Sequence, residues 1–443
     1  MNRQRSRNLA DNTQLARTTG RLGTGVIALN GIIGSGIFAL PAVAMQQAGY
    51  FSPWVFLIAA LLITTIALSF ARAASFFRET GGPIVYTTYS FGRFVGFQTG
   101  WLLYISRVAG LAASTNLLVS YASWFAPVLD APLIRPATVA ALISLYTWVN
   151  YVGVKNSMAV LYALTVLKLA PLLLLVIVGL PATELDPILR ADIPGAQMLG
   201  ETILIVMYAF IGFEVAVINA GESKNPKVDI PIALMSAVAL VSAFYIIIQI
   251  VSISADPAIA QTNKPLAQVA ERLLGPIGAS VLAFGAVFSI AGSSAASMLV
   301  GPRLTFALGA QQTIPKWFSA VHPKFGTPGN SILFCGALGI LLGVSGGFVW
   351  LATISTLVRF VTYVLTIASL PRIERTMAKD PGQFAIPGGI IVPVFAFFLS
   401  IWLVGHAPIK AWAAAAALSL IGSAFYLVMR QRDSFKKVEI EGQ

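Results

Sequence analysis

A glycine-rich interruption in the first apolar stretch is the part of the sequence best suited to bind a ligand. The segment Gly31–Phe38 reads Gly-Ile-Ile-Gly-Ser-Gly-Ile-Phe inside a run that would otherwise form one helix. A break there would place the N–H groups of Ser35, Gly36 and Ile37 at a helix start, which binds anions well. Carbonyls left free around Ile32 and Ile33 would accept hydrogen bonds from a cation. The pattern therefore favours an α-amino acid, with close packing of helices through small residues as the structural alternative.

Four ionisable side chains lie within apolar stretches. Glu214 follows a second glycine-containing break, Phe210–Glu214, while Arg107, Lys168 and Arg359 are cations in other stretches. Burying charge in a membrane is costly, so such residues are functional candidates. The structural alternative is mutual neutralisation, for instance of Arg107 by Glu214. One acid cannot neutralise three cations. The positive potential that remains after such pairing would favour a bound carboxylate.

Several other kinds of chemistry have little support in the sequence. The two histidines, His322 and His406, are far apart, and Cys335 is the single cysteine. Neither a metal site nor an internal disulfide is expected from them. The phosphate-loop pattern of ATP-driven proteins does not occur. We see no nucleophile–base–acid set, so we predict a protein that is not an enzyme and needs no cofactor.

The elements that position these residues are membrane helices. The chain has 443 residues, of which 57% are hydrophobic and 10% charged, whereas soluble domains average about 25% charged residues. A spanning helix needs about 20 apolar residues. Twelve such spans can be placed, at 22–47, 52–75, 91–126, 136–154, 158–180, 197–220, 228–254, 276–310, 328–347, 348–371, 387–405 and 408–430. The boundary at 348 has the weakest signal.

The net charge of +12 follows the predicted topology. Most Lys and Arg residues fall in the N-terminal tail, in alternate loops and in the C-terminal tail. The opposite loops carry only Arg135, Arg190, Lys264, Arg272 and Lys410. This bias predicts a multi-pass protein of the cell inner (plasma) membrane with both termini in the cytoplasm. The lipid bilayer is then a partner, and no nucleic acid is expected.

The two breaks suggest an internal symmetry. They fall in the first and sixth spans, which would cross the membrane in opposite directions, as in an inverted repeat. We predict a cytoplasmic basic tail at 1–21, repeats at 22–180 and 197–371, peripheral helices at 387–430 and a cytoplasmic tail at 431–443. The stretch 265–274 would be a surface helix or an external gate.

Together these motifs resemble the amino acid–polyamine–organocation (APC) superfamily, over essentially the whole chain. The residues that carry the resemblance are Gly34-Ser35-Gly36-Ile37-Phe38 with Pro41, Phe210–Glu214, Lys224-Asn225-Pro226, Gly81–Tyr86, and Arg303 with Pro315. Bacterial amino acid permeases and the arginine/agmatine antiporters are the most similar members. The resemblance implies an all-α integral membrane protein with twelve transmembrane helices, a LeuT-type 5+5 inverted repeat, broken helices 1 and 6, and alternating access.

The resemblance also implies roles for individual residues. Ser35, Gly36 and Ile37 would hold the substrate carboxylate, and the carbonyls of Ile32 and Phe210 its ammonium group. The other substrate-site positions would be Ser106, Arg107, Tyr208, Gly212, Phe213 and Ser297. Arg107 would repel a guanidinium, which argues against arginine or agmatine as the substrate.

Coupling and gating roles fall on a second set of residues. Lys168 matches a lysine of sodium-independent members, whose ammonium replaces the second sodium ion between spans 1 and 8. Ser293 and Ser294 would be its partners in span 8. Glu214 and Arg359 complete the set as the charged residues of spans 6 and 10.

The sequence thus predicts a secondary active transporter of amino acids, sodium-independent, and either proton-coupled or an exchanger. Neutral or acidic amino acids would be preferred. A polyamine, organic-cation or basic amino acid exchanger is the first alternative, and a membrane sensor that binds without transport is the second. A homodimer and a role for protons are left open.

Overall fold

The regular elements of the described chain are helices. The computed structural model describes residues 20–77, 81–153, 158–218, 226–378 and 383–441. Within these ranges no strand is present. The α-helices are α2 Arg21–Ile32, α3 Gly36–Ala48, α4 Ser52–Ala74, α5 Pro83–Phe91, α6 Arg93–Ala122, α7 Ile134–Val152, α8 Met158–Gly179, α9 Asp186–Leu189, α10 Ala196–Val206, α11 Glu214–Ile218, α12 Pro226–Ala255, α13 Pro265–Ala310, α14 Gly329–Ser345, α15 Phe348–Thr376, α16 Ile391–Gly405 and α17 Ile409–Glu441.

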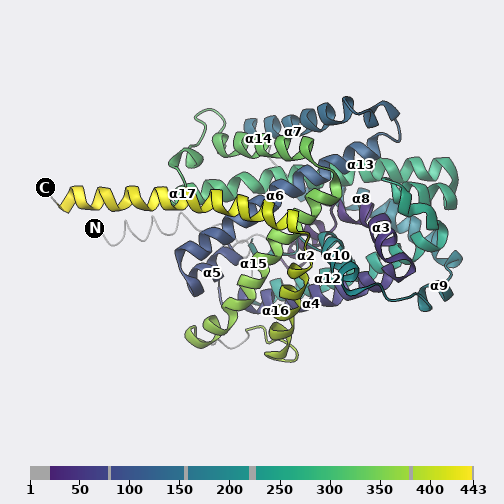
Figure 1. Cartoon of the computed structure of the whole chain (residues 1–443), viewed down its shortest axis with the longest axis horizontal. Helices are drawn as coiled ribbons and strands as arrows, with labels where there is room; N and C mark the ends of the chain where they lie inside the picture. Colours follow the sequence, from purple (N-terminus) through teal and green to yellow (C-terminus); the bar gives the residue numbers. More distant parts are fainter. Residues whose placement is uncertain (1–19, 78–80, 154–157, 219–225, 379–382, 442–443) are drawn as a thin grey trace.

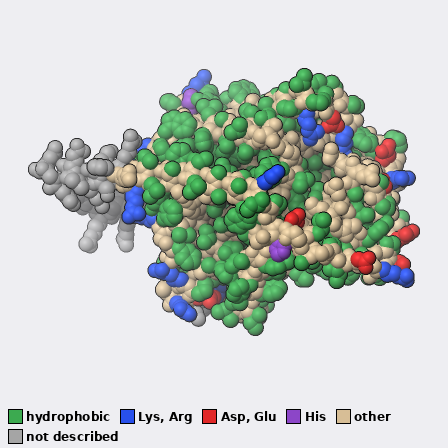
Figure 2. All heavy atoms as spheres, viewed as in Figure 1, with side chains coloured by type: hydrophobic (Ala, Val, Ile, Leu, Met, Phe, Trp, Pro, Cys, Tyr) green, Lys and Arg blue, Asp and Glu red, His purple; other side chains and the backbone are tan. Residues whose placement is uncertain are grey.

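Many of these helices are suited to a membrane. By length and composition, seven helical segments of the described residues could cross one, and four shorter apolar helices accompany them. Large apolar side chains such as Val166, Ile177 and Phe398 are 64–68% exposed, as expected where lipid replaces water. On the face drawn in Figure 2, hydrophobic side chains cover most of the body. Lys and Arg lie toward both ends of this view, whereas most Asp and Glu lie toward one of them.

The helix breaks lie where the sequence places them. The predicted span 22–47 is divided between α2 and α3 at residues 33–35, and the span 197–220 is divided between α10 and α11. The weak boundary at 348 is also present, since α14 ends at Ser345 and α15 begins at Phe348. The division into twelve spans and two inverted repeats stays a prediction.

Two segments, α5 and the end of α17, differ from the predicted boundaries. The helix α5 lies mainly between the predicted spans 52–75 and 91–126, in the stretch expected to be a loop, and it ends at Phe91 because Gly92, with φ 88°, cannot continue a right-handed helix. The predicted division between the surface helix at 265–274 and the span 276–310 is present, because α13 consists of two helices joined at Gly275, whose φ of 72° is not helical. The last helix, α17, continues to Glu441 rather than ending near 430, and Figure 1 shows it projecting past the bundle at the end opposite α9.

The helix α6 lies at the centre of the bundle. It packs extensively against α13 and α15, and also against α5 and α14. In the most apolar part of α6, 89% of the residues are buried, whereas the corresponding part of α17 is only 17% buried. A helix buried all round is a firm support for polar side chains, and Ser106, Arg107 and Ser114 of α6 line the same cavity as residues of the two helix breaks.

Candidate binding site between the two interrupted helices

The first break leaves a helix start inside the bundle. The helix α2 ends at Ile32, and Ile33 leaves the helical conformation with ψ 89°. The helix α3 begins at Gly36 after Ser35, whose side chain makes no capping hydrogen bond. The first N–H groups of any helix lack an intrahelical acceptor. At α3 these groups belong to buried residues, so a ligand with an acceptor oxygen would satisfy them.

The second break is built around Gly212. A short 3₁₀ turn, Met207–Ala209, extends α10 before the chain leaves the helix, and α11 begins at Glu214. Gly212 has φ 115°, a conformation that side chains disfavour. Its N–H donates to Glu214 Oε2 at 3.0 Å. The carboxylate therefore satisfies a backbone group that the break leaves without a helical partner.

The two breaks touch through their backbones. A Cβ added to Gly31 would lie 2.5 Å from the carbonyl oxygen of Gly212, and one added to Gly212 would lie 2.1 Å from that of Gly31. A Cβ added to Gly36 would lie 2.6 Å from the Cα of Ala209. The sequence suggested two roles for the glycine motif, anion binding by its N–H groups and close packing of helices. The contact between Gly36 and Ala209 accounts for this glycine by packing against the second interrupted helix.

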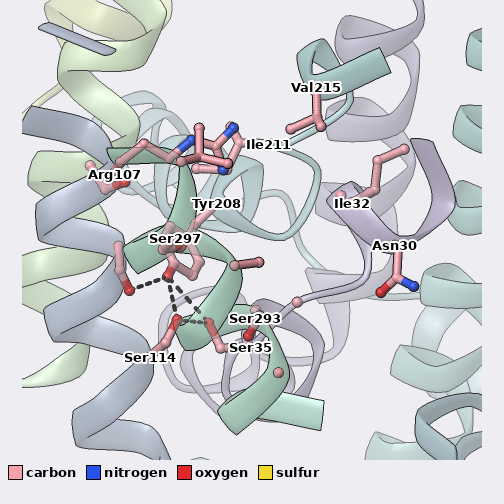
Figure 3. A pocket seen from close by; sticks show the side chains of 18 of the residues that line it. Asn30, Ile32, Ser35, Arg107, Ser114, Tyr208, Ile211, Val215, Ser293 and Ser297 are labelled. Atoms are coloured by element: carbon pink, nitrogen blue, oxygen red, sulfur yellow. Dashed lines mark hydrogen bonds between the residues drawn. The ribbon is translucent and has the colours of Figure 1, made fainter. Parts of the chain in front are cut away.

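A cavity of about 220 Å³ lies beside the two breaks. Figure 3 shows Ser35, Ser114 and Tyr208 grouped at one end of it and Arg107 beside Ile211 at the other. Its walls come from α2, the two breaks, α6, α8, α13 and α15. No carboxylate is among the described residues that line it, which include the cations Arg107, Lys168 and Arg359.

Three hydroxyl groups close one end of the cavity. Ser35 Oγ lies 2.7 Å from Ser114 Oγ, and Tyr208 OH lies 3.2 Å and 3.3 Å from these two atoms. Tyr208 OH is also 3.4 Å from the carbonyl oxygen of Gly110. The ring of Tyr208 packs edge-on against Phe348, with 5.6 Å between centroids. This cluster joins the first break to α6 and offers hydroxyls to a polar ligand.

The charged cluster is organised by Glu214, whose side chain is fully buried. The carboxylate accepts hydrogen bonds from Arg359 Nη1, from Arg107 Nη2 at 3.2 Å and from Tyr363 OH at 2.9 Å. Arg359 Nε also donates to Ser106 Oγ at 2.8 Å. The expected pairing of Arg107 with Glu214 is thus present, and Arg359 shares the same carboxylate. Two guanidinium groups on one carboxylate leave one positive charge uncompensated.

Lys168 lies against the first break, 4% exposed. Its ammonium donates to the carbonyl oxygen of Ile33 at 2.7 Å, to that of Asn30 at 3.4 Å and to Asn30 Oδ1. These oxygens belong to the end of α2, the span 1 side that the resemblance implies. The partners implied in span 8 differ, because Lys168 has no hydrogen bond to Ser293 or Ser294 within the described residues. Ser293 Oγ donates instead to the carbonyl of Ile290.

The structure brings most of the predicted residues together. The predicted residues that line the cavity are Ile32, Ser35, Gly36, Ser106, Arg107, Lys168, Tyr208, Ser293, Ser297 and Arg359. The others lie outside its lining and are Ile37, Phe210, Gly212, Phe213, Glu214 and Ser294. Phe210 packs against Phe56 and Tyr245, and Phe213 packs against Phe70 and Tyr363. The two phenylalanine rings thus pack beside the second break, outside the cavity lining.

Sequence reasoning missed four polar residues of this region. Asn30 precedes the glycine motif, and Ser114 follows Arg107 by seven positions on α6. Ser355 and Tyr363 lie four positions before and after Arg359. Residues three, four and seven apart share a helix face, so a search along that face from each intramembrane cation would have found Ser114, Ser355 and Tyr363. The signal for Asn30 was its adjacency to the break.

Comparisons with known proteins identify the family of this chain. The family model described as amino acid permease matches residues 20–429. A methylthioribose transporter of Bacillus subtilis is 26% identical, with 95% of each chain covered. A serine/threonine exchanger of the same bacterium, SteT, is 25% identical over 94% of this chain and 98% of its own. The branched-chain amino acid permease BcaP of Bacillus subtilis is 24% identical, with 88% of each chain covered. The chain therefore belongs to the amino acid permease family of the APC superfamily, as its motifs predict.

Proposed function

We propose that this protein is a secondary active transporter that carries amino acids across the cell inner membrane by alternating access, without sodium. The observation that carries the proposal is the meeting of two interrupted helices at a cavity that is rich in donors. Membrane proteins tolerate broken helices where the broken backbone lines a cavity, and transporters place substrates there. The relatives that exchange serine and threonine or carry branched-chain amino acids, according to their names, support the same class of substrate.

The charge around the cavity supports a preference for neutral or acidic amino acids over lysine and arginine. Arg107, Lys168 and Arg359 line the cavity, and no carboxylate does so within the described residues. A second positive charge on the substrate would be repelled by these groups. The same argument counts against polyamines and organic cations.

The cavity extends along one side of the first break. Its lining includes Ile27, Asn30, Gly31 and Ile32 of α2, but only Gly36 of α3. If the N-terminus is cytoplasmic, as the charge bias predicts, the cavity lies on the cytoplasmic side. The structure would then correspond to an inward-facing state in which the cluster of Ser35, Ser114 and Tyr208 closes the outer side.

A second substrate class has one observation in its favour. The methylthioribose transporter is a relative over the full length of the chain, and methylthioribose is a neutral solute with hydroxyl groups. The hydroxyls of Ser35, Ser114 and Tyr208 would suit such a molecule. A thermal-shift screen of the purified protein against amino acids, amines and methylthioribose would separate these classes, because a ligand of the native state raises apparent stability by mass action.

Transport itself is tested by counterflow in proteoliposomes. Vesicles loaded with an unlabelled amino acid should accumulate the same labelled amino acid in choline buffer as well as in sodium buffer. Binding without counterflow would identify a membrane sensor instead. Counterflow of labelled amines but not of amino acids would identify an organic-cation exchanger.

A further inference from the structure

We propose that the substrate is an acidic amino acid whose side-chain anion is held by Arg107, an inference that rests on the proposed function and narrows its substrate class. The starting point is the balance of buried charge. Among the described residues that line or adjoin the cavity, Arg107, Lys168 and Arg359 oppose one carboxylate, that of Glu214, and these side chains are largely or wholly buried. Buried cations are costly unless an anion or several acceptors compensate them. The balance can be followed group by group.

Lys168 is compensated by oxygen atoms. Its ammonium has three donors, and the structure supplies three acceptors on Asn30 and Ile33. This group stabilises the first break, and all of its donors are used within the protein. Lys168 is therefore not the cation that would bind the side-chain anion of the substrate.

Arg359 is the closer partner of Glu214. It donates to the carboxylate from Nη1 and to Ser106 Oγ from Nε, and its side chain is 3% exposed. Tyr363 OH and the N–H of Gly212 complete the shell of Glu214. The carboxylate is thus satisfied without Arg107 and balances the charge of Arg359.

Arg107 is the cation in excess. Its Nη2 makes a 3.2 Å contact with the shared oxygen of Glu214. Its Nε and Nη1 have no acceptor among the described residues, and its side chain is 14% exposed, into the cavity that it lines. A guanidinium with two unused N–H directions is suited to a carboxylate, since both groups are planar.

The cavity provides separate places for the two anionic groups of such a substrate. The helix start at Ser35–Gly36 and the side chain of Arg107 line the same cavity, and they lie toward opposite ends of it in Figure 3. A substrate with one carboxylate would leave one of these places empty. A dicarboxylic amino acid would occupy both and would reduce the excess charge.

The test compares each acidic amino acid with its amide, which has nearly the same shape and lacks the charge. In wild-type protein, competition by aspartate in the counterflow assay is compared with competition by asparagine, and competition by glutamate with competition by glutamine. We expect at least one acid to compete about tenfold better than its amide, as loss of one charge-assisted hydrogen bond implies. Amides that compete as well as the acids in both pairs would overturn the inference while leaving amino acid transport intact. Failure of all amino acids to exchange would instead overturn the proposed function.

Variants show whether Arg107 is responsible. Arg107→Gln should bring the acid-to-amide ratio close to one, and Arg107→Lys should keep a preference for the acid. Arg303→Gln is the matched control, because Arg303 is exposed on α13 outside the cavity lining. A purely structural role of Arg107 would weaken acid and amide equally, which would contradict the proposal.

Chloride could supply the same negative charge, so the assay is repeated with gluconate in its place. The acid preference should persist without chloride. If neutral amino acids bind best and lose affinity when chloride is removed, an inorganic anion occupies Arg107 and the proposal is wrong.

Discussion

Replacing Lys168 with Met is the most direct test of how the first break is held. The substitution keeps most of the side-chain length and removes the ammonium that donates to Ile33 and Asn30. A hydrogen bond from a charged donor contributes about 1.5–3 kcal/mol, and Ile33 is 1% exposed, so water cannot easily replace the donor. Losing about 2–3 kcal/mol of this stabilisation would lower the population of molecules with the present geometry of the first break by roughly 30- to 150-fold.

The measurement is counterflow in proteoliposomes together with the apparent melting temperature in detergent. We expect Lys168→Met to reduce exchange at least tenfold while the protein still elutes as a single species. Lys316→Met, at an exposed lysine in the loop after α13, should behave like wild type. Wild-type exchange should be equal in sodium and choline, because the buried ammonium of Lys168 beside the first break would repel a sodium ion there. Steep sodium dependence of the wild type, or normal exchange by Lys168→Met, would refute this reasoning.

Three further substitutions probe the helix breaks and the buried charge. Gly212→Ala should prevent accumulation of folded protein, since the new Cβ would lie 2.1 Å from the carbonyl oxygen of Gly31; fluorescence-detected gel filtration checks this against Gly25→Ala, whose Cβ meets nothing within 4 Å. Gly36→Val should lower both yield and substrate binding because of Ala209, and normal yield with lost binding would point to a ligand clash instead. Glu214→Gln should destabilise the protein by about 3–5 kcal/mol, as breaking a buried ion pair does; an unchanged melting temperature would show that its arginine partners find other acceptors.

The elements of this protein follow largely from local signals. A run of apolar residues must be helical in lipid, and a cluster of glycines inside such a run permits a break. These signals identified both interrupted helices and the separation of α14 from α15 at Gly346 and Gly347. The segment of α5 was assigned mainly to a loop, because a helix of nine residues is too short to appear as a span.

The candidate site could be predicted only in part, because its contacts join residues far apart in the chain. The sequence indicates that Arg107 and Glu214 are costly inside a membrane, and it gives the type of partner each needs. It does not show that Arg359 shares the same carboxylate, since that depends on how α6, α11 and α15 pack. For Lys168 the prediction named serines of span 8, whereas the structure supplies Asn30 and the carbonyl oxygen of Ile33. The glycine pattern predicted free carbonyls at the break, but it did not show that a lysine of another span would donate to them.

The contact between Gly31 and Gly212 has a consequence for genetic analysis of this protein. An overpacked interior can be relieved when a neighbouring side chain is shortened, since the total volume is then conserved. Here each glycine faces the backbone oxygen of the other, so neither neighbour has a side chain to shorten. A selection for second-site revertants of Gly31→Ala or Gly212→Ala should therefore return the original glycine codon far more often than a compensating change at the partner.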